Sequence, residues 1–484
     1  MCGRITIIAA WAQSLRLARR RTRDVILISL PSSGDPMSTS DRRHAVVLGA
    51  SIAGLLAARV LSDHFEHVTV LDRDELPFEP SHRQHVPQSR HIHALLARGR
   101  EALGRLFPGF DDEIVSRGGR MGDPGLRAIM IFAGHRHCPR PTPYRAILAS
   151  RILIEDVLRE RVRANPRIGI CDQTEATGFL WKEACVAGVR IRTSAGEIAM
   201  QADLVMDCTG RGSRTPAWLS SEGFPPPLEE QQRIDVRYRS RHVRVPIAAD
   251  EEPFIMVVAA TPDDPRGGVI AYQDNGLYLC TLAGCSGKTA PADPKGFVEF
   301  AKTLARPDLC EVLARSEFVD EAHSFGTPSN LRRRYESCRR FPRGLLVMGD
   351  AISSFDPTYG QGMTVAAMEA EQLASWLTYP RASAQDWFRM TARLIDRPWI
   401  IATQGDAYVL DVPGSRRGIT GIINRYLERL HSRASIDPVV ADAFLRVTHL
   451  YDPPSALLRP EILWRVMRGP GLESSQVSTL TTPR

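Results

Sequence analysis

HAVVLGASIAG, residues 44–54, is the stretch that decides how this chain folds. Its apolar run predicts a buried strand, and the small residues that follow predict the start of a helix. Gly49 would allow a tight turn between the two, and Gly54 would let the helix approach the strand closely. The helix N-terminus would then offer free N–H groups to a pyrophosphate. We therefore predict a dinucleotide-binding turn formed by Gly49, Ser51, Ile52, Ala53 and Gly54.

An acidic residue follows the next predicted strand, VTVL at 68–71. Asp72 lies about 20 residues after the glycine turn, where an acid in a βαβ unit binds a ribose hydroxyl. We include Asp72 and its neighbour Arg73 in the predicted cofactor site. Ser51 stands where the usual pattern has glycine, and because it is small it keeps the backbone accessible.

The composition excludes several classes of protein. The formal charge is +7, but the basic residues are nearly all arginine and no aromatic-basic interleaving accompanies them, so we do not expect nucleic-acid binding. No window approaches about 18 uninterrupted apolar residues, so we expect no membrane span. The nine cysteines are scattered without a C-x-x-C pair, so we expect no metal site and reduced thiols, as in a cytoplasmic protein.

Residues 1–36 do not have the pattern of the fold. Their apolar runs are too short for a good secretory core, and PSSGDP at 31–36 is typical of a linker. Our hypothesis is that Met37 is the natural start and that the preceding segment is a mis-annotated or disordered extension, with a targeting peptide as the less favoured alternative. The composition of the last residues also predicts disorder.

A second strand runs into a glycine turn at residues 202–214. Asp207 ends the strand and Gly210 lies in the turn, the place where ligands bind in open α/β sheets. Residues 233–285 then alternate as strands without helices between them, which predicts an antiparallel sheet. His91 and His93 share a face on a strand but not on a helix, so hydrogen bonding to a cofactor or capping is favoured over a metal pair.

A third strand, within residues 345–364, delivers Gly349 and Asp350. Asp350 could accept hydrogen bonds from the hydroxyls of a polyol. Gly360 and Gly362 would expose N–H groups at the start of a helix over 363–376, which suits a developing negative charge. The alternative is a glycine-rich turn with a solvated aspartate, which the nucleotide turn upstream disfavours.

These motifs, in this order, resemble the flavin monooxygenase superfamily of para-hydroxybenzoate hydroxylase. Within it, the chain is most similar to the FAD-dependent polyene epoxidases of polyether-antibiotic biosynthesis. The segments that carry the likeness are QSRHIH (88–93), TGRGSR (209–214), FDPTYGQGM (355–363) and PWI (398–400). The resemblance covers about residues 43–410.

The resemblance implies an α/β fold: a Rossmann-like FAD domain with a parallel sheet, a substrate domain with an antiparallel sheet, and a C-terminal helical region. The predicted divisions are an N-terminal extension (1–42), three parts of the FAD domain (43–115, 146–230 and 326–378), two parts of the substrate domain (116–145 and 231–325), the helical region (379–470) and a disordered tail (471–484).

The resemblance also implies roles for residues. Arg90 and Arg151 match arginines that contact the phosphates or ribityl chain of FAD, and Asp350 would bind the ribityl chain. Pro357, Gly360, Gln361 and Gly362, with Met363, would face the flavin ring through backbone dipoles, and no catalytic acid or base is assigned. Thr209 stands where many aromatic hydroxylases have an aspartate linked to NADPH handling, so the details of those enzymes do not transfer directly.

The implied reaction uses NAD(P)H and O2. A flavin C4a-(hydro)peroxide would deliver one oxygen atom to an apolar substrate, by alkene epoxidation or by hydroxylation in secondary metabolism. The protein would be a monomer or a homodimer, and a separate flavin reductase could supply its electrons. The alternatives are an alkene reductase of the geranylgeranyl-reductase type and an FAD-binding scaffold without chemistry. Flavin-dependent halogenases carry a W-x-W-x-I-P motif, whereas no two of the seven tryptophans here are two apart.

Overall fold

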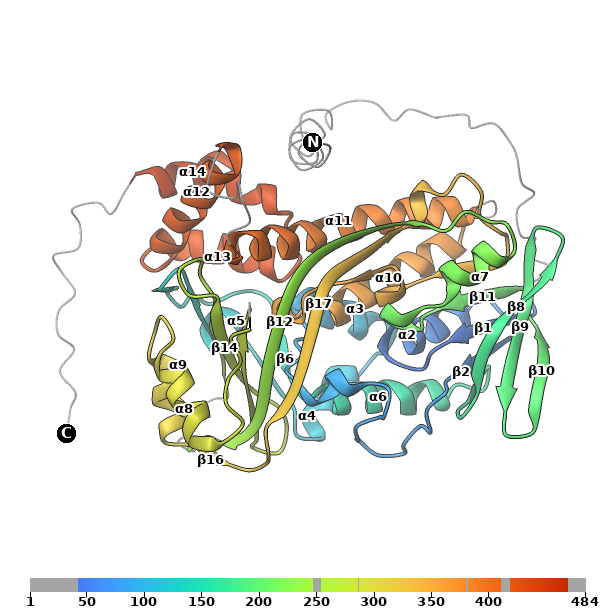
Figure 1. Ribbon diagram of the computed structural model, residues 1–484, viewed down its shortest axis with the longest axis horizontal. Coiled ribbons are helices and arrows are strands. Elements are labelled where there is room, and N and C mark those ends of the chain that lie inside the picture. The colour runs from blue at the N-terminus through green and yellow to red at the C-terminus, as the bar shows by residue number, and fades with distance from the viewer. Residues whose placement is uncertain (1–41, 247–253, 286, 380–381, 411–417, 469–484) are drawn as a thin grey trace.

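The computed structural model describes residues 42–246, 254–285, 287–379, 382–410 and 418–468. The predicted tail, and all of the predicted N-terminal extension except Arg42, lie outside these residues, as does the hypothesis about Met37. The described chain has three regions: a parallel sheet with helices, a large mostly antiparallel sheet, and a group of C-terminal helices (Figure 1).

The first region is built on a parallel sheet of five strands that contains the nucleotide turn. In spatial order its strands are β18 (Leu345–Val347), β11 (Leu204–Asp207), β1 (His44–Leu48), β2 (His67–Leu71) and β7 (Ile168–Cys171). Ala45 to Leu48 are all buried, which explains why β1 reads as an unbroken apolar run. The strands predicted before the two downstream glycine turns are β11, which pairs with β1, and β18, which lies on the far side of β11.

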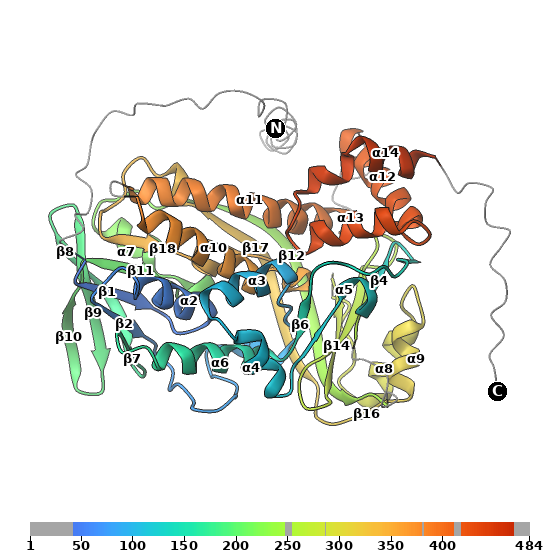
Figure 2. The same ribbon diagram turned by 180° about the vertical axis from the view of Figure 1, so that it is seen from behind.

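Several helices pack on or near this sheet. Helix α2 (Ile52–Leu61) packs against β1, β2 and β11, and it contacts α6 (Arg151–Arg163) and α10 (Gly362–Leu377). Figure 2 shows α3 (Ala97–Leu106) beside α10 from behind. Ser150 caps α6 by accepting a hydrogen bond from the N–H of Leu153, as its position before the apolar stripe predicts.

The second region is a sheet of nine strands, antiparallel except where β13 pairs with β4. In order its strands are β19 (Ser353–Ser354), β17 (His323–Arg334), β12 (Leu228–Arg244), β15 (Tyr278–Gly284), β14 (Arg266–Tyr272), β13 (Ile255–Val258), β4 (Ala128–Phe132) and β5 (His135–Arg136), with β16 (Glu317–Phe318) against β12. A smaller meander of β8 (Glu175–Lys182), β9 (Cys185–Thr193) and β10 (Gly196–Gln201) contacts β11 through β9.

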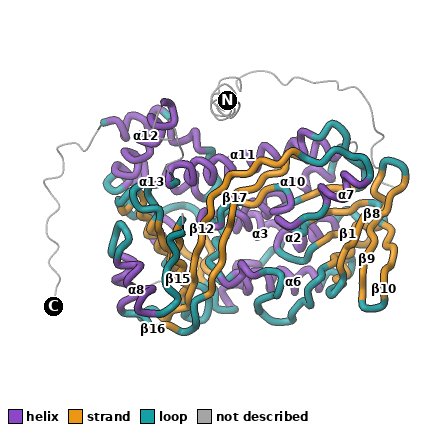
Figure 3. Tube along the Cα trace, viewed as in Figure 1, coloured by secondary structure: helices purple, strands orange, loops and turns teal. Residues whose placement is uncertain are grey.

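Strands β12 and β17 connect the regions. They pair from Leu228 opposite Arg334 to Ser240 opposite His323, and Figure 3 shows them running from the parallel-sheet side to the far end of the molecule. The residue boundaries between domains remain a prediction.

The third region is helical. It comprises α11 (Ala384–Val409), α12 (Gly418–Ala434), α13 (Pro438–Thr448), η7 (Pro454–Leu458) and α14 (Pro460–Met467). Helices α12, α13 and α14 share a hydrophobic core of their own, and α11 packs against α10. The predicted α/β fold with parallel and antiparallel sheets is confirmed. Within the described ranges, no helix has the length and apolar character needed to cross a bilayer.

Candidate functional site

The nucleotide turn requires glycine at two positions. Gly49 has φ +96°, and a Cβ there would lie 2.7 Å from the carbonyl oxygen of Cys208. A Cβ at Gly54 would lie 1.7 Å from the carbonyl oxygen of Gly49, so helix and turn touch at this point. The close approach that the sequence predicts is therefore present, and it leaves the start of α2 open to a ligand.

Asp72 lies at the end of β2, where an acid was expected, and its carboxylate is engaged by the chain itself. Oδ2 accepts hydrogen bonds from the N–H of Ala50 (2.7 Å) and from Arg83 (3.1 Å), and Oδ1 accepts from the N–H of Asp74 (2.9 Å). Asp72 thus ties β2 to the nucleotide turn, while the neighbouring Arg73 is exposed.

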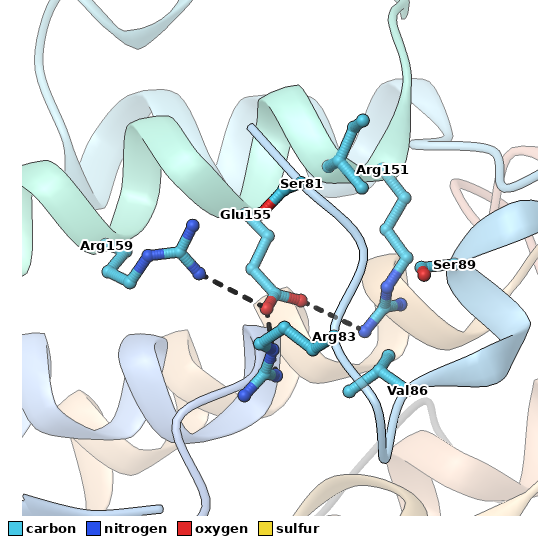
Figure 4. A pocket seen from close by; sticks show the side chains of 8 residues that line it. Ser81, Arg83, Val86, Ser89, Arg151, Glu155 and Arg159 are labelled. Carbon is cyan, nitrogen blue, oxygen red and sulfur yellow. Dashed lines mark hydrogen bonds and ion pairs between the residues drawn. The ribbon is translucent and has the colours of Figure 1, made fainter. Parts of the chain in front are cut away.

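Three arginines surround one carboxylate beside this turn (Figure 4). The carboxylate of Glu155 lies 2.9 Å from Arg83, 3.3 Å from Arg151 and 3.5 Å from Arg159. The Nε groups of all three arginines are buried and have no acceptor among the described residues. Unpartnered guanidinium donors are costly in an interior and bind phosphate well, so these residues fit an anionic pyrophosphate.

Ser51 joins the turn to this cluster. Arg151 donates a hydrogen bond of 2.7 Å to the Ser51 hydroxyl, which itself donates one of 3.0 Å to Glu155. Serine in place of the usual glycine therefore positions Arg151 on the turn. Arg90, the other predicted phosphate ligand, is exposed and does not line this pocket.

The two other glycine turns meet at Asp350. A Cβ on Gly349, at φ +68°, would lie 2.8 Å from Cβ of Ala53, so this turn abuts the nucleotide helix. A Cβ on Gly210 would lie 3.9 Å from Cβ of Asp350, and one on Gly362 would lie 4.0 Å from its Oδ1. The fold thus brings together three glycines from separate motifs around one aspartate.

The carboxylate of Asp350 is exposed, and no described residue donates a hydrogen bond to it. The dense protein around it raises the pKa of Asp350 by desolvation, while the positive charges of Arg151 and Arg211 lower it. An accessible acceptor between two arginines and a set of glycines fits the hydroxyls of a polyol chain.

Unlike Asp350, Asp207 is bound by its own chain. It is buried, and its two oxygens accept from the N–H and hydroxyl of Thr209 (2.9 and 2.6 Å) and from the hydroxyls of Ser213 and Thr215 (2.5 and 2.7 Å). The carboxylate of Asp207 therefore holds its own turn closed, with Gly210 at the tip.

The Gly349 turn is supported from beneath by Glu369 of α10. The N–H of Gly349 donates a hydrogen bond of 2.7 Å to Oε2 of Glu369, which is fully buried. Burial raises the pKa of Glu369 to about 8, and the charge of Asp350 adds to the rise. Arg333 joins this turn to the Gly210 turn by donating 3.0 Å hydrogen bonds to the carbonyls of Ala351 and Arg211.

The loop before α10 separates Asp350 from a large cavity. Gly360 has φ +62°, and its Cβ would lie 2.8 Å from Cβ of Ala94. Gln361 is buried, and its Oε1 has no donor among the described residues. Gly362 and Met363 form the first turn of α10, whose N–H groups have no partner within the helix. An unpaired acceptor beside free N–H groups fits a heterocycle with both donors and acceptors.

The cavity has a volume of about 830 Å³ and lies between the nine-stranded sheet and the C-terminal helices. Its walls are mostly apolar, and residues 356–360 form part of them. His91 and His93 also line it. His91 hydrogen-bonds Ser240 (2.7 Å), and desolvation by burial lowers the pKa of His91 to about 4 and that of His93 to about 3, so both imidazoles are neutral at pH 7.

Two buried carboxylates lie where the loop meets this cavity. Asn330 bridges them: it accepts from the N–H of Asp356 (2.6 Å) and donates to Oδ2 of Asp406 (2.6 Å). Desolvation raises the pKa of both acids, and for Asp406 the charge of Asp356 is the next cause. Because two carboxylates this close cannot both ionise cheaply, the pair holds a proton at neutral pH.

Sequence reasoning missed Glu155, Glu369 and Asp406. A signal existed for Glu155, since Arg151, Glu155 and Arg159 are spaced four apart on one helix face. Glu369 and Asp406 belong to no motif. In the described part of the chain, no group of three or more histidine, cysteine or acidic side chains is placed to hold a metal ion.

Comparisons with known proteins identify a family and several related proteins. The model of the family described as "FAD binding domain" matches residues 42–388. Protein Rv3254 of Mycobacterium tuberculosis is 34% identical over 433 residues, which are 84% of this chain and 90% of that protein. The 6-methylpretetramide 4-monooxygenase of Streptomyces rimosus is 26% identical over 352 residues, which are 70% of this chain and 76% of that enzyme.

Solved structures share the fold at low sequence identity. A flavoprotein/dehydrogenase from Cytophaga hutchinsonii has a TM-score of 0.60 at 15% identity, covering 87% of this chain and 96% of that one. The flavin-dependent brominase Bmp2 has a TM-score of 0.59 at 14% identity, covering 83% and 98%. PqsL of Pseudomonas aeruginosa, a probable FAD-dependent monooxygenase, has a TM-score of 0.56 at 14% identity, covering 76% and 100%.

Proposed function

We propose that this chain, which belongs to the FAD-binding domain family, is a monooxygenase that inserts one oxygen atom from O2 into an apolar substrate. The proposed electron donor is NAD(P)H. The proposed reaction is alkene epoxidation, as in the polyene epoxidases that the sequence resembles, or hydroxylation in secondary metabolism. The observation that carries the proposal concerns one continuous segment, residues 349–363: both of its ends, Gly349 and Gly362, lie beside Asp350, and its middle, residues 356–360, lines the apolar cavity.

The residues around the three glycine turns would hold FAD. Arg151, positioned by Ser51, would bind the pyrophosphate together with the N-terminus of α2, and Asp350 would accept hydrogen bonds from the ribityl hydroxyls. The start of α10 and Oε1 of Gln361 would meet the polar edge of the flavin ring. Asp72 would act at the ribose end through the turn that it ties to β2.

FAD, when bound, would supply the reaction with O2 and the transfer of an oxygen atom. The chain's share is to bind and orient the substrate and to exclude water, which the apolar walls of the cavity favour. The Asp356–Asp406 pair holds a proton at the cavity wall and could exchange it with a substrate hydroxyl or a newly formed one.

The cavity volume supports a large apolar substrate, because it lies toward the upper end of the roughly 300–1,000 Å³ of ordinary ligand pockets. One relative is named for oxygenation of 6-methylpretetramide, and this supports hydroxylation as the second form of the proposed reaction.

The test begins with anaerobic reduction of the bound flavin by NADPH or NADH. Isotopically heavy O2 is then added with a panel of polyenes and polycyclic phenols, and O2 uptake and product mass are measured. Heavy oxygen in the product supports the proposal. Saturation of an alkene without O2 would favour a reductase, and a flavin that no donor reduces would favour a scaffold without chemistry.

A further inference from the structure

The large cavity opens to the surface between α12 and α14. Ile422, Leu463 and Met467 all line the cavity, yet their exposed fractions are 60%, 40% and 57%. Residues that are part of a cavity wall and also in contact with solvent mark its mouth. In Figure 1 the two helices lie at the outer end of the molecule, remote from the parallel sheet.

Helix α14 carries apolar residues on the side that faces solvent as well as on the side that faces the protein. Its buried residues are Ile462 and Val466, and Leu463, Trp464 and Met467 are exposed. Trp464 is 55% exposed and directly follows Leu463, which lines the mouth. Charged residues occupy only part of the exposed surface of α14, as the ion pair between Glu461 and Arg465, so three exposed apolar side chains on one short helix are unusual for a surface that contacts water alone.

Arginines border the same mouth. Arg425 and Arg429 line the cavity and are exposed, and the guanidinium of Arg468 lies 4.2 Å above the Trp464 ring. Within the described residues, none of these three arginines forms an ion pair with a carboxylate. Glu428, on the same helix, accepts a hydrogen bond from Tyr408. Three arginines thus stand against this one carboxylate, and the mouth combines exposed apolar side chains with a net positive charge.

We propose that the mouth of this cavity docks on an anionic lipid bilayer, with Leu463, Trp464 and Met467 in the interface and the arginines against the headgroups. Exposed apolar and aromatic residues flanked by arginine are typical of helices that lie in a membrane interface. A mouth of this kind lets an apolar compound pass from lipid into the cavity without crossing water, a route that rests on the proposed function.

A lipid surface fits better than a second copy of the chain, because the rim is positive and two copies meeting at this mouth would place like charges together. A carrier protein would have to supply both an acidic surface and a matching apolar patch. An anionic bilayer supplies both at once. The chain's overall formal charge of +7 favours the same partner.

The experiment is flotation of the full-length FAD-bound protein with vesicles of phosphatidylglycerol and phosphatidylcholine in equal parts, against vesicles of phosphatidylcholine alone. We expect binding to the anionic vesicles that weakens with salt. Trp464→Ser should reduce the bound fraction. Phe78→Ser is its matched control, since Phe78 is 80% exposed and also carries an arginine, Arg163, over its ring at 4.3 Å.

Charge is tested by the double reversal Arg425→Glu with Arg429→Glu, which should lower vesicle binding by about tenfold or more. The control is Arg393→Glu with Arg397→Glu, two exposed arginines at the same spacing on α11. Absence of wild-type binding, or equal binding by Trp464→Ser, would overturn the proposal. So would a dimer that Trp464→Ser dissociates. Flavin content and O2 uptake, measured without vesicles, test the proposed function separately.

Discussion

The hydroxyl of Tyr359 donates a hydrogen bond of 3.0 Å to Oδ1 of Asp406, and this contact links the loop before α10 to the C-terminal helix α11. Gly405 makes room for it, because a Cβ there would lie 2.1 Å from the Tyr359 hydroxyl oxygen. The titratable groups that face Asp406 and its partner Asp356 include Tyr359, Cys285 and Tyr238, none of which is positive at neutral pH. None of these neighbouring groups is a cation that would stabilise both carboxylates in their ionised form, so the acid pair keeps its proton.

This arrangement makes stability depend on pH. Burial, together with the charge of Asp356, raises the pKa of Asp406 to about 8, whereas an unfolded aspartate titrates near ~4. Between these values the unfolded chain releases a proton that the folded protein keeps, so the contribution of this group to stability falls as pH rises through that window. Asp406→Asn should reduce the decline of Tm between about pH 4 and pH 8.

Part of the decline should remain in that variant, because the raised pKa of Glu369 acts in the same direction. Asp112→Asn, at an exposed position on α4 (Phe110–Ser116), should leave the decline unchanged. Parallel Tm profiles for wild type and Asp406→Asn would show that Asp406 is ionised in the folded protein.

Gly54→Ala should abolish retention of FAD. The added Cβ would lie 1.7 Å from the Gly49 carbonyl oxygen, so α2 must move away from the turn that it shares with β1. The measurement is flavin per folded chain, with folding checked by circular dichroism. Gly104→Ala on α3 is the control, because a Cβ there meets nothing within 4 Å. A folded Gly54→Ala protein with a full complement of FAD would contradict this prediction.

The parts of the fold that the sequence predicts are those encoded locally. Strand β1 and helix α2 follow from an apolar run and a glycine turn within one short stretch, and the helix expected over 363–376 is α10, Gly362–Leu377. Strands β11 and β18 follow as well, because each ends beside an acid and a glycine turn, and β2 follows from an apolar run that ends in Asp72. Such local patterns can be read from the sequence because they depend only on residues that are close together in the chain.

The contacts that the sequence could not predict join distant segments. Asp406 meets Asn330 across 76 positions, and Ser51 meets Arg151 across 100. Nothing near either partner encodes the pairing, because β17 and α6 come beside their partners only when the sheets assemble. The roles of Asp350, Arg151 and the flavin-facing loop remain predictions that binding measurements must test.

Ser51 and Arg151 should be coupled in FAD binding. If the hydroxyl positions the guanidinium, Ser51→Gly should weaken FAD binding in the wild type but have no further effect once Arg151 is replaced by Gln. A double-mutant cycle of FAD affinities should therefore give a coupling of about 0.5–3 kcal/mol. Additive effects would mean that Arg151 reaches its position without Ser51.

Asp350→Asn should weaken FAD binding by roughly 1–3 kcal/mol, because a hydrogen bond to a charged acceptor is replaced by a weaker one. Asp350 is exposed, and no described residue donates a hydrogen bond to it, so the substitution leaves no partner of its own chain unpaired. Any loss of FAD affinity can then be assigned to the ligand rather than to the fold.

Fluorescence titration of the apo-proteins with FAD measures the effect. Asp356→Asn serves as the contrasting variant, since Asp356 is buried and accepts a hydrogen bond of 2.9 Å from the N–H of Thr358. We expect it to lower Tm, with a smaller loss of FAD affinity than Asp350→Asn causes. If Asp350→Asn binds FAD as tightly as wild type while Asp356→Asn does not, the ribityl ligand lies in the loop before α10 and not at the end of β18.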